Sequence, residues 1–295
     1  MIIDGHPIGA DHPPFVVAEM SANHCGSLDR AIMLISAAAQ AGAHAIKLQC
    51  YHPAALAIAR GGMDKRLETG PWAGRTLFEI YDEGHTPREW FPALFEQAER
   101  AGITIFSSVF DEDGVDFLAS MNVPAYKISS FDMKNIPLII KAAGTHKPVI
   151  LSTGMGKMDD VKAGLCATLK CDGAAIEVRQ AALLHCVSAY PCAPEDANLK
   201  RIPELQAGRD SSCVPVGFSD HTLGIECATG AVALGACIIE KHLTLARADG
   251  GLDAEFSAEP HELKALVASV TNVWKACRPP SGQAEIYKHL RVKAA

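Results

Sequence analysis

Polar and charged side chains recur in this sequence at the ends of short apolar runs. Two lysines, Lys47 and Lys127, lie within such runs, and serines follow several others: Ser108, Ser130, Ser152 and Ser219. Ammonium groups surrounded by hydroxyls suit a phosphate or a phosphorylated carboxylate. The pattern therefore predicts an anion-binding pocket, provided that the fold brings these run ends together.

Two histidines follow the last two apolar runs, in Ser219-Asp220-His221 and Glu240-Lys241-His242. With Glu19, at the end of the first run, they could share a divalent metal and leave positions open for water and substrate, as Lewis-acid catalysis requires. Hydrogen-bonded core histidines are the alternative, and spacing alone does not decide between them. A GxSxG elbow is absent from the sequence, which disfavours a serine hydrolase.

Eight units, each an apolar run followed by a helical pattern, must position these side chains. The predicted strands are residues 15–19, 45–49, 104–108, 125–128, 148–152, 181–186, 214–218 and 237–240. The predicted helices are residues 28–41, 87–101, 111–121, 135–144, 157–170, 198–207, 223–235 and 260–277. Residues 50–86 interrupt this order with Gly61-Gly62 and Gly70-Pro71, and we interpret them as an inserted excursion with one helix.

Alternating strands and helices imply parallel pairing with right-handed crossovers. Eight such units predict an α/β fold, a closed (β/α)8 TIM barrel, with an open doubly wound sheet as the competitor. Neither GxGxxG after the first strand nor GxxxxGK[ST] occurs, which disfavours the nucleotide-binding open sheets. In a barrel all eight strand ends share one rim, so the polar side chains would converge on one site.

Composition narrows the classes of partner. The 295 residues are 48% hydrophobic and 21% charged. With 27 basic and 34 acidic residues, the formal net charge is −7, which disfavours nucleic acid or an anionic membrane as a partner. The chain has no apolar run of the ~18 residues that a membrane span needs. Its start lacks the pattern of a signal peptide, and its ten cysteines form no CxxC pair. We therefore expect a reduced, cytoplasmic protein.

Six segments carry further information: FVVAEMSANH (15–24), AIKLQ (45–49), PAYKISS (124–130), VILSTGM (149–155), LHC (184–186) and FSDHTLG (218–224). In this order they resemble the motifs of the sialic acid synthases. Other segments look most like pseudaminic acid synthases within that family: GPWAGRTLFEIY (70–81), VSAYP (187–191) and DGGLD (249–253).

The resemblance implies condensation of phosphoenolpyruvate with an N-acetylated amino sugar to a nine-carbon 2-keto acid. Carbon 3 of phosphoenolpyruvate attacks the aldehyde, water adds at carbon 2, and phosphate leaves with C–O cleavage. The implied sugar is 2,4-diacetamido-2,4,6-trideoxy-altrose, and N-acetylneuraminate or legionaminate synthesis is the alternative. The implied cofactor is Mn²⁺ or Mg²⁺.

The resemblance also implies roles for residues at the motif positions. His221 and His242 would bind the metal, and Glu19 would position water or act as acid or base beside it. Phosphoenolpyruvate would be held by Lys47, Ser108, Lys127, Ser130, Ser152 and Ser219. The sugar would be contacted by Asp132, Tyr190 and Asp253. Asp132 is one methylene shorter than the glutamate expected there, which shortens its reach.

The resemblance divides the chain into a synthase barrel, residues 1–280, and a tail, residues 281–295, that we interpret as the remnant of a linker. By the same resemblance, family members continue through this linker into an antifreeze-like domain, and we expect this chain to lack that domain. We expect a homodimer. Two alternative functions stay open: a Schiff-base aldolase using Lys47, Lys127 or Lys241, and a non-catalytic barrel that binds sugar or phosphoenolpyruvate.

Overall fold

Eight parallel strands close into a barrel in the computed structural model, which describes residues 1–168, 180–207 and 214–279. The strands are β3 (Phe15–Glu19), β4 (Ala45–Cys50), β5 (Thr104–Val109), β6 (Tyr126–Ile128), β7 (Val149–Ser152), β8 (Ala181–Cys186), β9 (Val216–Asp220) and β10 (Ile238–His242). Around the barrel they follow the order β10-β3-β4-β5-β6-β7-β8-β9. The predicted (β/α)8 barrel is confirmed, and the open sheet is excluded.

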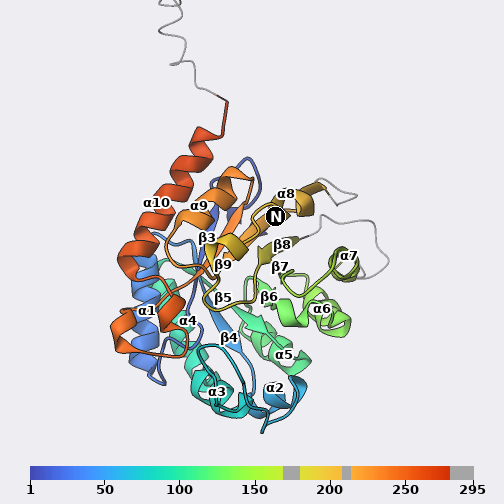
Figure 1. Cartoon of the computed structure of the whole chain (residues 1–295), viewed down its shortest axis with the longest axis vertical. Coiled ribbons are helices and arrows are strands. Elements are labelled where there is room, and N and C mark those ends of the chain that lie inside the picture. The colour runs from blue at the N-terminus through green and yellow to red at the C-terminus, as the bar shows by residue number, and fades with distance from the viewer. Residues whose placement is uncertain (169–179, 208–213, 280–295) are drawn as a thin grey trace, which may run out of the picture.

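Helices surround the strands (Figure 1). They are α1 (Leu28–Gln40), α2 (Pro53–Ala59), α3 (Leu77–Gly84), α4 (Phe91–Ala101), α5 (Glu112–Ser120), α6 (Ile136–Ala143), α7 (Met158–Ala167), α8 (Arg201–Ala207), α9 (Glu226–Ala233) and α10 (Pro260–Ala276). Buried apolar side chains of the helices join those of the strands in one core, as Leu34 and Ile35 of α1 and Leu266 of α10 illustrate. Within the described residues, no helix is long and apolar enough to cross a membrane.

Local sequence explains where many helices begin and end. Ser27 accepts a hydrogen bond from the Arg30 amide at the start of α1, and Thr76 and Glu79 form a reciprocal capping box at the start of α3. Helix α4 ends at Gly102, whose φ of 67° lies in the left-handed region that glycine adopts without strain.

The structure differs from the predicted elements in three places. Residues 50–86 hold two helices, α2 and α3, instead of one. An antiparallel pair, β1 (Ile2–Ile3) and β2 (His6–Pro7), precedes the barrel. Strand β9 ends two residues later than predicted, and β10 continues from the residues predicted to begin it to His242. The last two residues of the helix predicted at 157–170 and the tail predicted at 281–295 lie outside the described residues.

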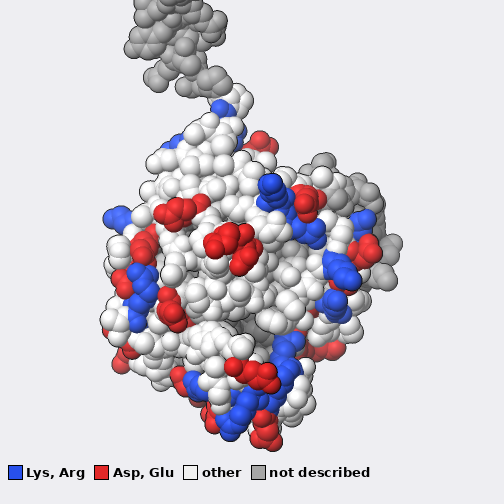
Figure 2. Space-filling view, in the orientation of Figure 1, with Lys and Arg blue, Asp and Glu red and all other residues white. Residues whose placement is uncertain are grey.

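Charged side chains are mixed in sign over the visible face (Figure 2), and both signs gather over the α2–α3 segment at the bottom of the view. Cys50 and Cys186 are free cysteines buried in the interior. Charged side chains also lie in the interior, where the lysines and carboxylates at the strand ends are almost completely buried.

Candidate active site

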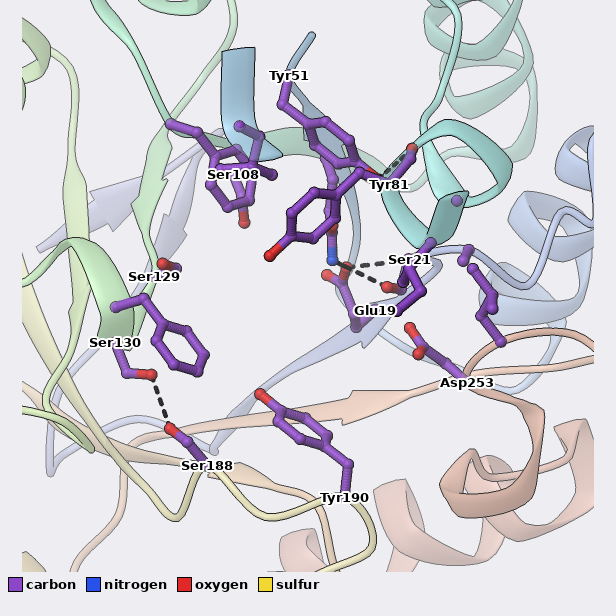
Figure 3. Close-up of a pocket in the computed structure, with 18 of the residues that line it drawn as sticks. Glu19, Ser21, Tyr51, Tyr81, Ser108, Ser129, Ser130, Ser188, Tyr190 and Asp253 are labelled. Atoms are coloured by element: carbon purple, nitrogen blue, oxygen red, sulfur yellow. Dashed lines mark hydrogen bonds between the residues drawn. The ribbon is translucent and has the colours of Figure 1, made fainter. Parts of the chain in front are cut away.

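A cavity of about 540 Å³ lies where the carboxyl ends of the barrel strands meet. Of the twelve predicted site residues, all except Asp132 line it: Glu19, Lys47, Ser108, Lys127, Ser130, Ser152, Tyr190, Ser219, His221, His242 and Asp253. Figure 3 shows two sides of this cavity, with Ser108, Ser129, Ser130 and Ser188 facing Glu19, Ser21 and Asp253. The structure therefore brings the strand-end residues together, and their individual roles stay predictions.

Two buried lysines lie among serine hydroxyls at the floor of the cavity. The Lys47 ammonium donates to Ser108 Oγ at 3.0 Å and forms ion pairs with Glu19 and, at 3.8 Å, with Glu240. The Lys127 ammonium donates to Ser152 Oγ at 2.6 Å. The barrel register explains this grouping, because Lys47 pairs with Glu19 across β3 and β4.

The two lysines differ in electrostatic setting. Burial alone would lower the pKa of Lys47, but the carboxylates of Glu19 and Glu240 outweigh burial and raise it. Burial lowers the pKa of Lys127, and Glu240 only partly compensates. Lys127 is therefore the ammonium that gains most from an incoming anion, since its positive charge is poorly compensated.

The carboxylate of Glu19, at the end of β3, contacts Lys47, a second side chain of β4 and the backbone just after β3. It accepts hydrogen bonds from the Ser21 amide at 3.1 Å and from Gln49 Nε2 at 3.0 Å. Burial raises the pKa of this carboxyl to about 7, with Glu240 adding to the effect and Lys47 opposing it. Glu19 can therefore hold or release a proton close to neutral pH.

His221 and His242 end adjacent strands, and their ring centroids lie 5.5 Å apart. His221 Nδ1 lies 2.7 Å from the Val187 carbonyl oxygen, which accepts a hydrogen bond from Nδ1–H, so the lone pair of the ring is on Nε2, 3.5 Å from Ser219 Oγ. Burial lowers the pKa of both imidazoles, and His221 and Lys47 lower that of His242 further. Both rings are therefore neutral at pH 7, the form that ligates a metal.

These residues fit a two-histidine metal site completed by water or substrate. His242 Nδ1 is buried and has no hydrogen-bond partner among the described residues, and it lies 3.6 Å from Asp253 Oδ2. The described part of the chain contains no cluster of three or more His, Cys, Asp or Glu side chains arranged to hold an ion. An ion bound here would therefore need open positions filled by water or substrate, as the sequence pattern predicts.

Tyr190 and Asp253 flank the histidines. The Tyr190 ring centroid lies 4.3 Å from that of His221, and Phe256 packs against the rings of both Tyr190 and His242. Burial raises the pKa of Asp253 to about 6 against the opposing hydrogen bonds of Ser21 and Ala22. An aromatic face and a carboxylate are thus available beside the histidines, which suits a polyhydroxylated ligand.

Asp132 lies behind the cavity wall rather than on it. Its Oδ2 accepts a hydrogen bond from Ser129 Oγ at 2.5 Å and forms an ion pair with Arg60 at 2.6 Å. Arg60, at the C-terminal end of α2, lines the cavity where Asp132 was predicted to do so. Asp132 therefore meets the cavity through two lining residues that it holds, Arg60 and Ser129.

Sequence reasoning assigned no role to several residues of the site. Glu240 belongs to the strand-end pattern, but spacing alone does not show that it forms an ion pair with Lys47 at 3.8 Å. The segment 50–86 supplies much of the outer wall: Leu56, Arg60, Lys65, Leu67, Trp72, Leu77, Ile80, Tyr81 and Gly84. Two signals in the sequence marked this segment: its position directly after a strand, where barrel loops carry function, and the motif at 70–81 that resembles pseudaminic acid synthases.

Comparisons with known proteins agree with this geometry. The model of the NeuB family matches residues 34–280. Pseudaminic acid synthase from Campylobacter jejuni is 40% identical over 262 residues, which cover 88% of this chain and 74% of that protein. N,N'-diacetyllegionaminic acid synthase from Legionella pneumophila is 35% identical, over 90% of this chain and 73% of that protein.

Solved structures give the same result. N-acetylneuraminic acid (sialic acid) synthetase from Leptospira borgpetersenii, determined in complex with citrate, superposes with a TM-score of 0.84 at 33% identity. The superposition covers 100% of this chain and 98% of that one. The resemblance drawn from the sequence motifs is thereby confirmed: this chain belongs to the NeuB family.

Proposed function

We propose that this chain condenses phosphoenolpyruvate with an N-acylated amino sugar and releases phosphate, forming a nine-carbon 2-keto acid of the pseudaminic type. The observation that carries the proposal is the combination, in one cavity, of two buried lysines among serine hydroxyls and two neutral histidines. The first pair suits a phosphorylated carboxylate, and the second suits a carbonyl that must become electrophilic. The identity to the Campylobacter jejuni enzyme favours the pseudaminic product over the neuraminate or legionaminate alternatives.

In this proposal the floor of the cavity binds phosphoenolpyruvate. Lys127 and Lys47 pair with its phosphate and carboxylate charges, while Ser108, Ser130, Ser152 and Ser219 supply hydrogen bonds. The cavity walls exclude bulk water, which strengthens each of these charge-assisted contacts. Carbon 3 of phosphoenolpyruvate then points toward the histidine side, where the aldehyde of the open-chain sugar is held.

His221 and His242 would hold the Mn²⁺ or Mg²⁺ ion, which when bound supplies Lewis-acid polarisation of the aldehyde oxygen. A C–C bond forms between carbon 3 of phosphoenolpyruvate and the aldehyde carbon, whose oxygen takes up a proton. Glu19 is placed to move that proton or to orient the water that adds at carbon 2. Cleavage of the bond between carbon 2 and the phosphate oxygen then leaves the 2-keto acid and free phosphate.

A phosphate-release assay tests the proposal. Phosphoenolpyruvate, Mn²⁺ and a panel of N-acetylated sugars are mixed with the protein, and we expect phosphate only when sugar and divalent ion are both present. His242→Ala should abolish release, whereas His261→Ala, which alters an exposed histidine of α10, should not. Equal release in the presence of a chelator would contradict the proposal, and ligand binding without release would support a non-catalytic barrel.

A lysine Schiff-base aldolase is the second candidate, and one observation favours it. Burial lowers the pKa of Lys127, which increases the fraction of neutral, nucleophilic amine. Lys241 is a poorer candidate, because its ammonium is paired with Asp220 at 2.8 Å and it does not line the cavity. Borohydride trapping of a pyruvate adduct, without any metal requirement, would identify this chemistry.

We further propose that residues 1–280 act as one synthase domain and that the chain forms a homodimer. Limited proteolysis should leave a barrel fragment that keeps phosphate release. Light scattering during gel filtration should give twice the mass of 31.4 kDa.

A further inference from the structure

The rim of the cavity opposite the histidines carries a cation that the sequence pattern did not single out. In the closed order of the barrel, β6 lies four strands from β10, so the turn after β6 faces His242 across the mouth. Asp132 belongs to that turn, Ser130–Asp132, and Arg60 reaches it from α2. A ligand with one end at the histidines that extends across the mouth would therefore meet Arg60.

The geometry decides which member of the pair a ligand meets. Asp132 is buried and is absent from the cavity lining, whereas Arg60 lines the cavity and its side chain is 21% exposed. An unpaired carboxylate in this place would accept hydrogen bonds from sugar hydroxyls. A guanidinium only donates, so this rim recognises an acceptor.

Apolar surface lies directly beside the guanidinium. Its Cζ atom lies 5.6 Å from the centroid of the Phe131 ring, and Leu56 of the same helix lines the cavity nearby. A carbonyl acceptor attached to a methyl group matches this combination of donor and apolar wall. A hydroxyl could also accept from the guanidinium, but it has no methyl group to cover the apolar surface, which would stay exposed to water.

We propose that Arg60 is a specificity-determining residue, whose guanidinium donates to the carbonyl oxygen of the sugar's N-acyl group that lies furthest from the aldehyde. This inference rests on the proposed function. It makes the Arg60–Asp132 pair the element that selects a 2,4-diacylamino sugar over a sugar with a hydroxyl at carbon 4. Asp132 acts as a positioning residue, because it holds the guanidinium and does not itself reach the cavity.

The test compares two sugars and two variants. Arg60→Met removes the donor, and Arg60→Met with Asp132→Asn removes it without leaving a buried carboxylate unpaired. Both should raise the KM for the 2,4-diacetamido-2,4,6-trideoxy sugar at least about tenfold, which corresponds to about 1.4 kcal/mol. The KM for the analogue with a hydroxyl at carbon 4 should change less than about threefold, and the KM for phosphoenolpyruvate should stay the same.

A matched control comes from the same segment. Arg75 pairs with Glu83 at 2.6 Å, as Arg60 pairs with Asp132, but it does not line the cavity. Arg75→Met should therefore leave both sugars unaffected. An equal rise in KM for both sugars, or a rise in the KM for phosphoenolpyruvate, would overturn the assignment of Arg60.

Calorimetric titration of both sugars, with phosphoenolpyruvate present, separates this inference from the proposed function. Tighter binding of the diacetamido sugar to the wild type than to both variants, without phosphate release, would support the role of Arg60 and contradict catalysis. Equal affinity of wild type and variants would overturn the role of Arg60, whether or not phosphate is released. If the wild type bound neither sugar, both the role of Arg60 and the proposed function would be overturned.

Discussion

Lys241→Met should destabilise the barrel more than the loss of any exposed ion pair. Lys241 and Asp220 are both essentially inaccessible to water, and the ammonium donates to Asp220 Oδ2 at 2.8 Å and to the Thr222 carbonyl oxygen. Removing the ammonium leaves the Asp220 carboxylate buried without its cation, a change that typically costs about 3–5 kcal/mol. Asp220 keeps two hydrogen bonds from Thr222, so we expect a loss of about 3 kcal/mol, at the lower end of that range.

Equilibrium unfolding in urea, followed by far-ultraviolet circular dichroism, measures this loss. The double variant Asp220→Asn, Lys241→Met should recover at least about 1 kcal/mol of it, because no charge is then left unpaired. Lys141→Met is the matched control: Lys141 pairs with Asp116 at 2.6 Å on the surface, where such pairs are worth about 0–1 kcal/mol. If Lys241→Met and Lys141→Met cost the same, the argument from buried charge is refuted.

Three further predictions concern the site, the pH response and the barrel wall. Lys127→Met should raise the KM for phosphoenolpyruvate at least about tenfold, with little change in the KM for the sugar. If steady-state kinetics showed an equal rise in both KM values, direct contact of Lys127 with phosphoenolpyruvate would be ruled out. Burial lowers the pKa of His24 to about 4, so the unfolded chain takes up a proton there first as the pH falls from about 6.5. This linkage removes up to about 3 kcal/mol of stability between about pH 6.5 and 4. In His24→Gln, the free energy of unfolding in urea should therefore change less with pH over this range. An unchanged pH dependence would exclude His24 as the source. At Gly217, a methyl group would lie 2.6 Å from Leu184 Cδ2 and would also clash with the Ile238 carbonyl oxygen. Gly217→Ala should therefore destabilise the protein by about 1–3 kcal/mol. An unchanged thermal midpoint would show that the neighbouring strands move aside without loss of stability.

The sequence allowed the barrel and most of its chemistry to be predicted. Buried parallel strands read as short continuous apolar runs, and their carboxyl ends meet at one rim, so the residue that ends each run is a site candidate before any coordinates exist. Lys47, Lys127 and the two histidines were found in this way. Tyr190 and Asp253 follow no such pattern and were predicted only from the family resemblance.

The wall built by residues 50–86 could not be predicted in the same way. Its helices are short, and its position depends on contacts far along the chain: Trp72 Nε1 donates to the Leu252 carbonyl oxygen at 2.8 Å, and Arg60 pairs with Asp132. Arg60 and Asp132 are 72 positions apart in the sequence, so no local periodicity could reveal the pair. Long-range ion pairs carry no signature in composition or spacing.

The sequence by itself therefore determined the architecture and the set of strand-end groups, because hydrophobic burial and strand length are local properties of the chain. Only the tertiary structure decided which of those groups meet. The register of β3, β4 and β10 places Glu19 and Glu240 on Lys47, and the packing of α2 over the turn after β6 puts Arg60 in front of Asp132. Asp132, which the family resemblance assigned to the sugar, is therefore covered by the guanidinium of Arg60. Its charge is buried, and a buried charge requires a cation at hydrogen-bond distance.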